Sequence, residues 1–144
     1  MSYIDPMDVT SPKVSVSNLQ PIIDCGEWEY SVTLLDWDRK SSLGIRWNGG
    51  SEDDGRVHPG NPQSRGLPTW FIVPENFQGA ILNTALSGEL GGGRIDPDAA
   101  RAAILKVLSK RSALASSQQA ESSDTEFEQK VIQVIERLKA QGKL

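Results

Sequence analysis

Cysteine and histidine are almost absent from this sequence, which contains one of each, Cys25 and His58. A single cysteine permits no disulfide within the chain, so a reducing compartment is expected. His58 has no recognisable ligand spacing to carboxylates, and no serine or cysteine lies in the sequence context of a nucleophile. We therefore predict that the protein is not an enzyme and binds no metal and no cofactor.

Long apolar runs are also absent, and no stretch approaches the roughly 18 residues that a membrane span requires. The segment that begins MSYIDPMDVT has neither the basic nor the apolar region of a secretory signal. The net charge of −4 argues against binding to bulk nucleic acid. These features predict a cytoplasmic protein without membrane or bulk nucleic-acid partners.

What the chain does contain is a set of short alternating segments in its first half. Apolar residues alternate over 27–35 and 42–48, which predicts two strands of an antiparallel hairpin. The segment 69–73 predicts a third strand, and 13–17 a short edge strand. In 42–48 the alternation groups Leu43, Ile45 and Trp47 on the core side. It leaves Arg46 and Asn48 on the opposite face, where a ligand can lie.

Three helices are predicted after the strands, over 75–86, 96–114 and 124–140. Asp96 and Pro97 are favourable at the start of the second, and Ser123 to Glu126 match a capping box before the third. The fold class is α+β, with a small antiparallel sheet of three to four strands covered by two or three C-terminal helices. The expected parts are a flexible arm (1–12), an α+β domain (13–114), a linker (115–123) and a C-terminal helix (124–144).

The last predicted helix has an apolar seam with a spacing of three and four residues. Its members are Phe127, Val131, Val134, Ile135 and Leu138. A helix of about 15 residues is marginal alone in water, so it must dock on something. Its own domain and another subunit are both open alternatives.

The polar segment 46–70 is the main candidate for function, because loops of this length are usually functional or disordered. We expect 49–56 to be mobile and 59–70 to be ordered, since prolines restrain only the second part. Its side chains are suited to an anionic or planar ligand: arginines form bidentate contacts with phosphate, polar groups orient the ligand, and a tryptophan stacks on it. The candidate ligand-binding residues are Arg46, Asn48, Asn61, Ser64, Arg65, Thr69 and Trp70. In the alternative interpretation the tryptophans are core residues, the arginines pair with loop acids, and the segment satisfies its own hydrogen bonds.

The blocks LGIRWNG (43–49) and GNPQSRGLPTWFIVP (60–74) combine arginine, asparagine and aromatic residues able to hold a phosphorylated ring. With its size and its sheet-plus-helix pattern, the chain resembles phage and bacterial counter-defence proteins that sequester nucleotide second messengers. The resemblance extends over no stretch that aligns residue by residue, and it implies an oligomer with sites between subunits. The favoured hypothesis is a binding module for a small phosphorylated or nucleotide-like ligand, working as a homo-oligomer. The alternatives are a protein-interaction module, of the immunity or inhibitor type, that acts through the acidic loop and last helix, and an enzyme that uses His58.

Overall fold

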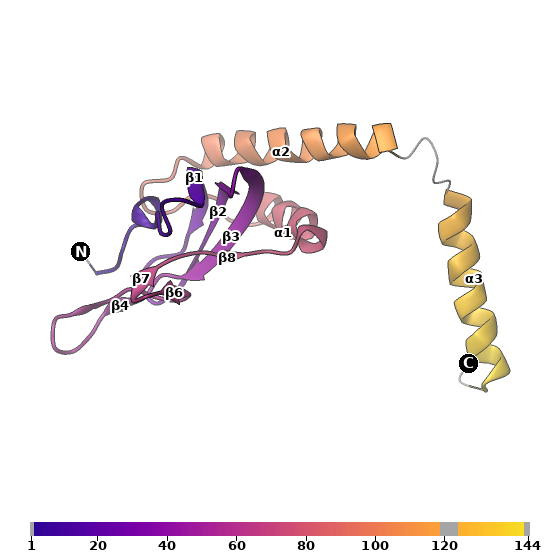
Figure 1. The fold of residues 1–144 in the computed structure, drawn as a ribbon, viewed down its shortest axis with the longest axis horizontal. Helices are drawn as coiled ribbons and strands as arrows, with labels where there is room; N and C mark the ends of the chain where they lie inside the picture. The colour runs from indigo at the N-terminus through magenta and orange to yellow at the C-terminus, as the bar shows by residue number, and fades with distance from the viewer. Residues whose placement is uncertain (1, 119–123, 143–144) are drawn as a thin grey trace. The chain divides into compact units, whose positions relative to one another are not determined.

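The structure is a computed structural model that describes residues 2–118 and 124–142, without the side chains of 115–118 and 124–128. A four-stranded antiparallel sheet is followed by three helices, which confirms the α+β class (Figure 1). The helices are α1 (Glu75–Ser87), α2 (Pro97–Gln118) and α3 (Asp124–Ala140). None of the described helices is long and apolar enough to cross a membrane.

The main sheet has the strand order β1 (Val16–Asp24), β2 (Tyr30–Trp37), β3 (Lys40–Trp47) and β8 (Phe71–Ile72). Strands β2 and β3 form the predicted hairpin, joined by a turn at Asp38 and Arg39, both of which have positive φ. Strand β1 is longer than the edge strand predicted over 13–17. Pro21 in the middle of β1 argues against a strand when only the sequence is considered. In the structure this proline lies beside a register shift, where a strand can accommodate a proline.

The polar segment between β3 and β8 contains four short strands. Strands β4 (Gly50–Ser51) and β5 (Val57–His58) pair with each other, as do β6 (Gln63–Ser64) and β7 (Leu67–Pro68). The first half, which we expected to be mobile, therefore forms a hairpin of its own. Its turn holds a hydrogen bond from the Glu52 amide to the Arg56 carbonyl, 2.8 Å long.

Both faces of the sheet are covered, which the sequence does not predict. Leu34 and Leu43 are buried on the face that α1 partly covers. On the opposite face Ser31 and Thr33 are also fully buried, although alternation predicts that this face meets solvent. That prediction is wrong because another part of the chain lies over it.

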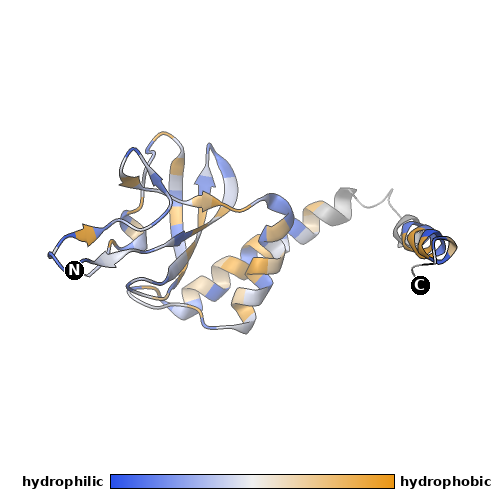
Figure 2. Cartoon of the chain, turned by 90° about the horizontal axis from the view of Figure 1, so that it is seen from below, coloured by the Kyte–Doolittle hydropathy of each residue, from blue (hydrophilic) through white to orange (hydrophobic). Residues whose placement is uncertain are grey.

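The cover of this second face is the N-terminal segment together with Trp70. Val9 is completely buried and belongs to one hydrophobic cluster with Val16, Leu35 and Trp70. The Trp70 indole donates a hydrogen bond of 2.9 Å to the Val9 carbonyl. A Cβ on Gly44 would lie 3.0 Å from the Cβ of Trp70, so glycine at this position lets Trp70 pack closely on β3. The region predicted as a flexible arm thus includes the core residue Val9. Figure 2 shows hydrophobic and hydrophilic residues mixed along the strands and helices.

The glycine-rich segment before α2 lies against the free edge of β1. The Asp24 amide donates to the Gly91 carbonyl at 2.8 Å, and the Gly91 amide donates to the Ile22 carbonyl at 2.9 Å. A Cβ on Gly92 would lie 2.0 Å from the Asp24 carbonyl oxygen. These glycines therefore allow the backbone to cover the edge of the sheet.

The chain divides into two compact units, residues 1–106 and 107–144. In the first unit Ala100 and Ile104, near the start of α2, are buried. Helix α2 continues to Gln118, four residues into the segment expected to be a linker (115–123). The rest of that linker and the start of the predicted capping box, Ser123, lie outside the described residues.

Candidate functional site

An apolar groove opens where the sheet extends beyond its helical cover. Along β3, Leu43 is fully buried, Ile45 is half-buried and Trp47 is 58% exposed. These three side chains share one face, because alternate residues of a strand point the same way. The exposure of these side chains therefore increases along β3 from Leu43 to Trp47, and Trp47 lies at the end of the row that α1 does not cover.

Neighbouring strands supply the rest of the groove. Tyr30 of β2 is paired with Trp47, and Phe71 of β8 is paired with Ile45, so all four lie on one face. Tyr30 and Trp47 meet edge to face with ring centroids 6.4 Å apart. Tyr30 is 42% exposed and Phe71 is 55% exposed. The cavity has a volume of 490 Å³, and its lining residues are Tyr30, Val32, Ile45, Arg46, Trp47, Asn61, Pro62, Phe71 and Ile81.

Helix α1 forms one wall of the groove. A second hollow of 320 Å³ lies beside the first and shares Tyr30, Val32 and Ile81 with its lining. The helix contributes small side chains there, Ala80, Thr84 and Ala85, and the hollow ends at Glu89. Small residues on α1 leave room between the helix and the sheet, and this explains why the row of aromatic residues stays accessible.

One acidic side chain, Glu89, lines the hollow beside the groove together with Tyr30. The pKa of Tyr30 is raised above its ordinary value, first by its hydrogen bond with Cys25 and the charge of Cys25, then by burial, and then by the charges of Glu29 and Glu89. Among the described lining residues the only cation is Arg46, whose guanidinium is committed elsewhere.

The Arg46 guanidinium bonds backbone carbonyls inside the protein and is not available to bind an anion. It is only 3% exposed, and its Nη1 donates a 2.6 Å hydrogen bond to the Thr69 carbonyl while Nη2 donates to the Pro59 carbonyl. Its Cζ lies 5.9 Å from the Trp70 ring centroid. Among the residues that the structure describes, Nε has no hydrogen-bond partner. Burial lowers the pKa of Arg46 to about 10. The expectation that Arg46 faces solvent is wrong, since Trp70 and the loop cover its face.

Asn48, Thr69 and Trp70 are likewise buried and engaged. The Asn48 side chain donates to the Gly26 carbonyl at 2.7 Å and accepts from Ser31 Oγ at 2.6 Å. Thr69 Oγ1 donates to the Ser11 carbonyl at 2.7 Å. Four of the seven predicted ligand residues are therefore buried and make hydrogen bonds within the chain. The alternative interpretation is confirmed for Trp70, which is a core residue. It is wrong for Trp47, which is exposed, and for Arg46, whose partners are backbone carbonyls and not loop acids.

The other three predicted residues, Asn61, Ser64 and Arg65, are exposed. Asn61 lines the groove, and its backbone pairs with that of Trp47 through hydrogen bonds of 2.7 and 3.0 Å. Ser64 and Arg65 belong to the β6–β7 hairpin, where Arg65 and Gly66 both have positive φ, at 52° and 79°. The structure therefore does not bring the seven residues together into one site.

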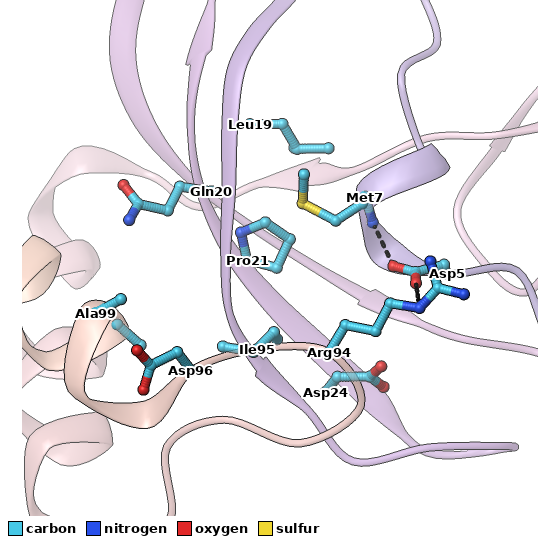
Figure 3. A pocket seen from close by; sticks show the side chains of 11 residues that line it. Asp5, Met7, Leu19, Gln20, Pro21, Asp24, Arg94, Ile95, Asp96 and Ala99 are labelled. Carbon is cyan, nitrogen blue, oxygen red and sulfur yellow. Dashed lines mark hydrogen bonds and ion pairs between the residues drawn. The ribbon is translucent and has the colours of Figure 1, made fainter.

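A smaller hollow of 170 Å³ lies by the N-terminal segment, between β1 and the start of α2 (Figure 3). Its polar residues include Asp5, Asp24 and Arg94, and Arg94 Nε is 3.9 Å from Asp5 Oδ2. Asp24 is buried and accepts hydrogen bonds from the Tyr3 hydroxyl at 2.8 Å and from Asn48 Nδ2 at 3.1 Å. The polar groups of this hollow bond to one another, so we interpret it as a place where the N-terminal segment and β1 pack together and not as a binding site.

Sequence reasoning missed the groove because the alternation placed Trp47 with the core residues Leu43 and Ile45. The available signal was the unequal length of the elements. Strands β2 and β3 have eight residues each, whereas β8 has only two, Phe71–Ile72, and Pro74 then precedes α1, which begins at Glu75. Such a short third strand leaves the far end of the hairpin without cover. No family model, curated protein or solved structure matches this chain.

Proposed function

We propose that this protein is a non-enzymatic protein-interaction module, whose groove between α1 and the sheet holds apolar side chains of a partner protein. The observation that supports the proposal is the accessible aromatic row of Tyr30, Trp47 and Phe71 around a 490 Å³ cavity. Exposed aromatic residues in a hollow are typical of binding hot spots. The exposed Cys25 thiol suits a reducing compartment, so we place the interaction in the cytoplasm.

The chemistry of the groove selects the kind of partner. Its floor is apolar, and Glu29 and Glu89 act on Tyr30 at one end. A phosphate in this groove would meet those carboxylates without an available arginine, because Arg46 is engaged with backbone carbonyls. A segment with apolar anchors followed by lysine or arginine matches both the floor and the rim. The site therefore differs from the acidic loop and last helix that the sequence suggests.

A displayed library of random peptides, selected on the wild-type protein, tests this proposal. We expect the selected peptides to share apolar anchors next to basic residues. Trp47→Ser should weaken their binding by about 2 kcal/mol or more, the usual loss for a hot-spot aromatic, which is about thirtyfold. Trp28→Ser is the matched control, because Trp28 is 52% exposed but lies against His58, outside the groove lining. Peptides that respond equally to both variants would contradict the proposal.

A second candidate is a binding module for a small phosphorylated or nucleotide-like ligand, like the sequestering proteins that the sequence resembles. One observation favours it. A two-residue hairpin turn with positive φ at both positions prefers Asn-Gly, yet this turn has Arg65 before Gly66. Because an arginine is unfavourable at this position of the turn, a role other than forming the turn would account for it. Binding of a phosphate by its exposed guanidinium is such a role.

Calorimetry with mono-, di- and cyclic nucleotides tests this second candidate. A charge-assisted contact is worth about 1.5–3 kcal/mol, so Arg65→Ala should weaken binding about 10- to 150-fold. Arg65→Lys should restore part of it, because a lysine lacks the planar fork. If no nucleotide in the panel gives heat of binding, the candidate is excluded and the protein-interaction proposal is unaffected.

A further inference from the structure

The second hollow, which lies beside the groove and has a volume of 320 Å³, has aliphatic walls. Strands β1 and β2 contribute Ile23 and Val32, and α1 contributes Ala80, Ile81 and Ala85. Ile23, Val32 and Ala85 are buried, so they form its floor rather than its mouth. An apolar group that enters such a hollow leaves water, which is favourable. The walls therefore suit a hydrocarbon chain.

The polar side chains of this lining all carry oxygen atoms: the hydroxyls of Tyr30 and Thr84 and the carboxylate of Glu89. Thr84 Oγ1 donates its proton to the Ala80 carbonyl at 2.9 Å. The hydrogen bond between the Tyr30 hydroxyl and Cys25 raises the pKa of Tyr30, an effect that a phenol shows when it is the donor. A hydroxyl has one proton to donate, so both oxygens, like the carboxylate, are left to accept hydrogen bonds. The lining therefore suits a positively charged donor and not an anion.

We propose that the second hollow binds a lysine side chain of the partner protein, next to the apolar side chains that the groove holds. The inference rests on the proposed function of the groove, with which the hollow shares Tyr30, Val32 and Ile81. The aliphatic stem of the lysine packs along the walls, and its ammonium meets the Glu89 carboxylate. The three donors of an ammonium find acceptors on the oxygen-bearing side chains. Arginine fits less well, because its five donors lie in a rigid planar fork that a single carboxylate leaves partly unpaired.

Glu89 is the residue that distinguishes a lysine from a neutral or acidic side chain in this hollow. It is exposed, so water and salt screen its attraction for an ammonium. Its contribution to affinity should therefore be modest, whereas an acidic side chain in the same place would be repelled. Such a contact decides which partner binds more than how tightly it binds.

Peptide selection on a charge-reversed protein tests the proposal. A displayed library of random peptides is selected in parallel on the wild type, on Glu89→Lys and on Glu52→Lys. Glu52 is exposed between β4 and β5, outside the lining of the groove and of the second hollow, so its variant controls for the change in net charge. The wild type and Glu52→Lys should select lysine beside the apolar anchors. Glu89→Lys should keep the anchors and select aspartate or glutamate in the place of the lysine.

The outcomes separate the lysine site from the groove. Peptides with the same anchors and the same basic residues on all three proteins would overturn the lysine site and leave the groove proposal standing. Peptides without common apolar anchors would contradict the groove proposal, and the lysine site with it.

Calorimetry with one peptide selected on the wild type measures the contact directly. Replacing its lysine by norleucine, which keeps a hydrocarbon chain without the ammonium, should weaken binding about two- to fivefold, the range of an exposed ion pair. Glu89→Gln should weaken binding of the lysine peptide by a similar factor and leave binding of the norleucine peptide unchanged. If Glu89→Gln affects both peptides equally, or neither, the ammonium does not meet Glu89 and the proposal is overturned. An arginine peptide that binds as tightly as the lysine peptide would overturn the assignment to lysine.

Discussion

Arg46 shows at the scale of one residue why a basic side chain in a polar segment need not bind a ligand. Its guanidinium is buried, and it bonds the carbonyls of Thr69 and Pro59, which lie on either side of the β6–β7 hairpin. A backbone carbonyl shielded from water needs a donor. Arg46, a residue of β3, thus holds both ends of the β6–β7 hairpin against this strand.

We predict that Arg46→Ala lowers the free energy of unfolding by about 2–3 kcal/mol, because two shielded carbonyls lose their donor. Arg46→Lys should recover only part of this stability, since one ammonium cannot copy the geometry of the fork. Urea denaturation measures the difference. The exposed Arg65→Ala is the control and should change stability by less than about 0.5 kcal/mol. An Arg46→Ala variant as stable as the wild type would contradict the structural role.

Tyr3 gives a prediction about alkaline pH. Burial, then the hydrogen bond to Asp24, raises the pKa of Tyr3 to about 12 from its ordinary 10.0. The folded protein keeps this proton while the unfolded chain loses it, so the stabilisation is full below pH 10 and is lost as pH rises toward 12. Tyr3→Phe should remove this part of the alkaline loss of stability. Unfolding curves of both proteins from neutral to alkaline pH check it, and parallel curves would exclude it.

The phenolate absorbance gives a second readout of the same pKa. The chain has two tyrosines, and both have raised pKa values. In the Tyr3→Phe variant only Tyr30 titrates, so the difference from the wild type isolates Tyr3. Replacing its partner by Asp24→Asn should lower the Tyr3 midpoint.

At the scale of whole elements, the sequence predicts most of the fold. Alternation over 27–35 and 42–48 finds β2 and β3, and the start signals near Asp96 find α2, because these patterns are local. Which face of a strand meets solvent is not local. The assignment of Arg46 to solvent failed because Val9 and Trp70 cover that face, and no alternation within β3 reveals distant cover. The candidate site was predicted less well than the fold for the same reason.

Two glycines test the cover of the sheet edge. Gly79 lies inside α1, and a Cβ there would meet nothing within 4 Å, so Gly79→Ala should stabilise the protein by about 0.5–1 kcal/mol. Gly92 has φ of +92°, and its Cβ would collide with the Asp24 carbonyl. Gly92→Ala should therefore destabilise by more than Gly79→Ala stabilises. Thermal melts of the two variants give the signs. A neutral Gly92→Ala would show that 91–93 does not press against β1.

At the scale of the whole molecule, the sign of the net charge changes near the boundary between the two compact units. Residues 1–93 contain 6 basic and 12 acidic residues, a net charge of −6, and residues 94–144 contain 9 and 7, a net charge of +2. The first compact unit, residues 1–106, contains the groove, and the second contains α3. We infer that peptide binding is a property of the first unit and does not need α3, so the two units are separate in this respect.

Truncation after Gln118 tests this separation. All groove-lining residues and all four tryptophans precede this point, so the shortened chain should melt at the wild-type temperature when tryptophan fluorescence is followed. It should bind a selected peptide in solution with unchanged affinity. A shortened chain that unfolds would show instead that the C-terminal helix stabilises the sheet.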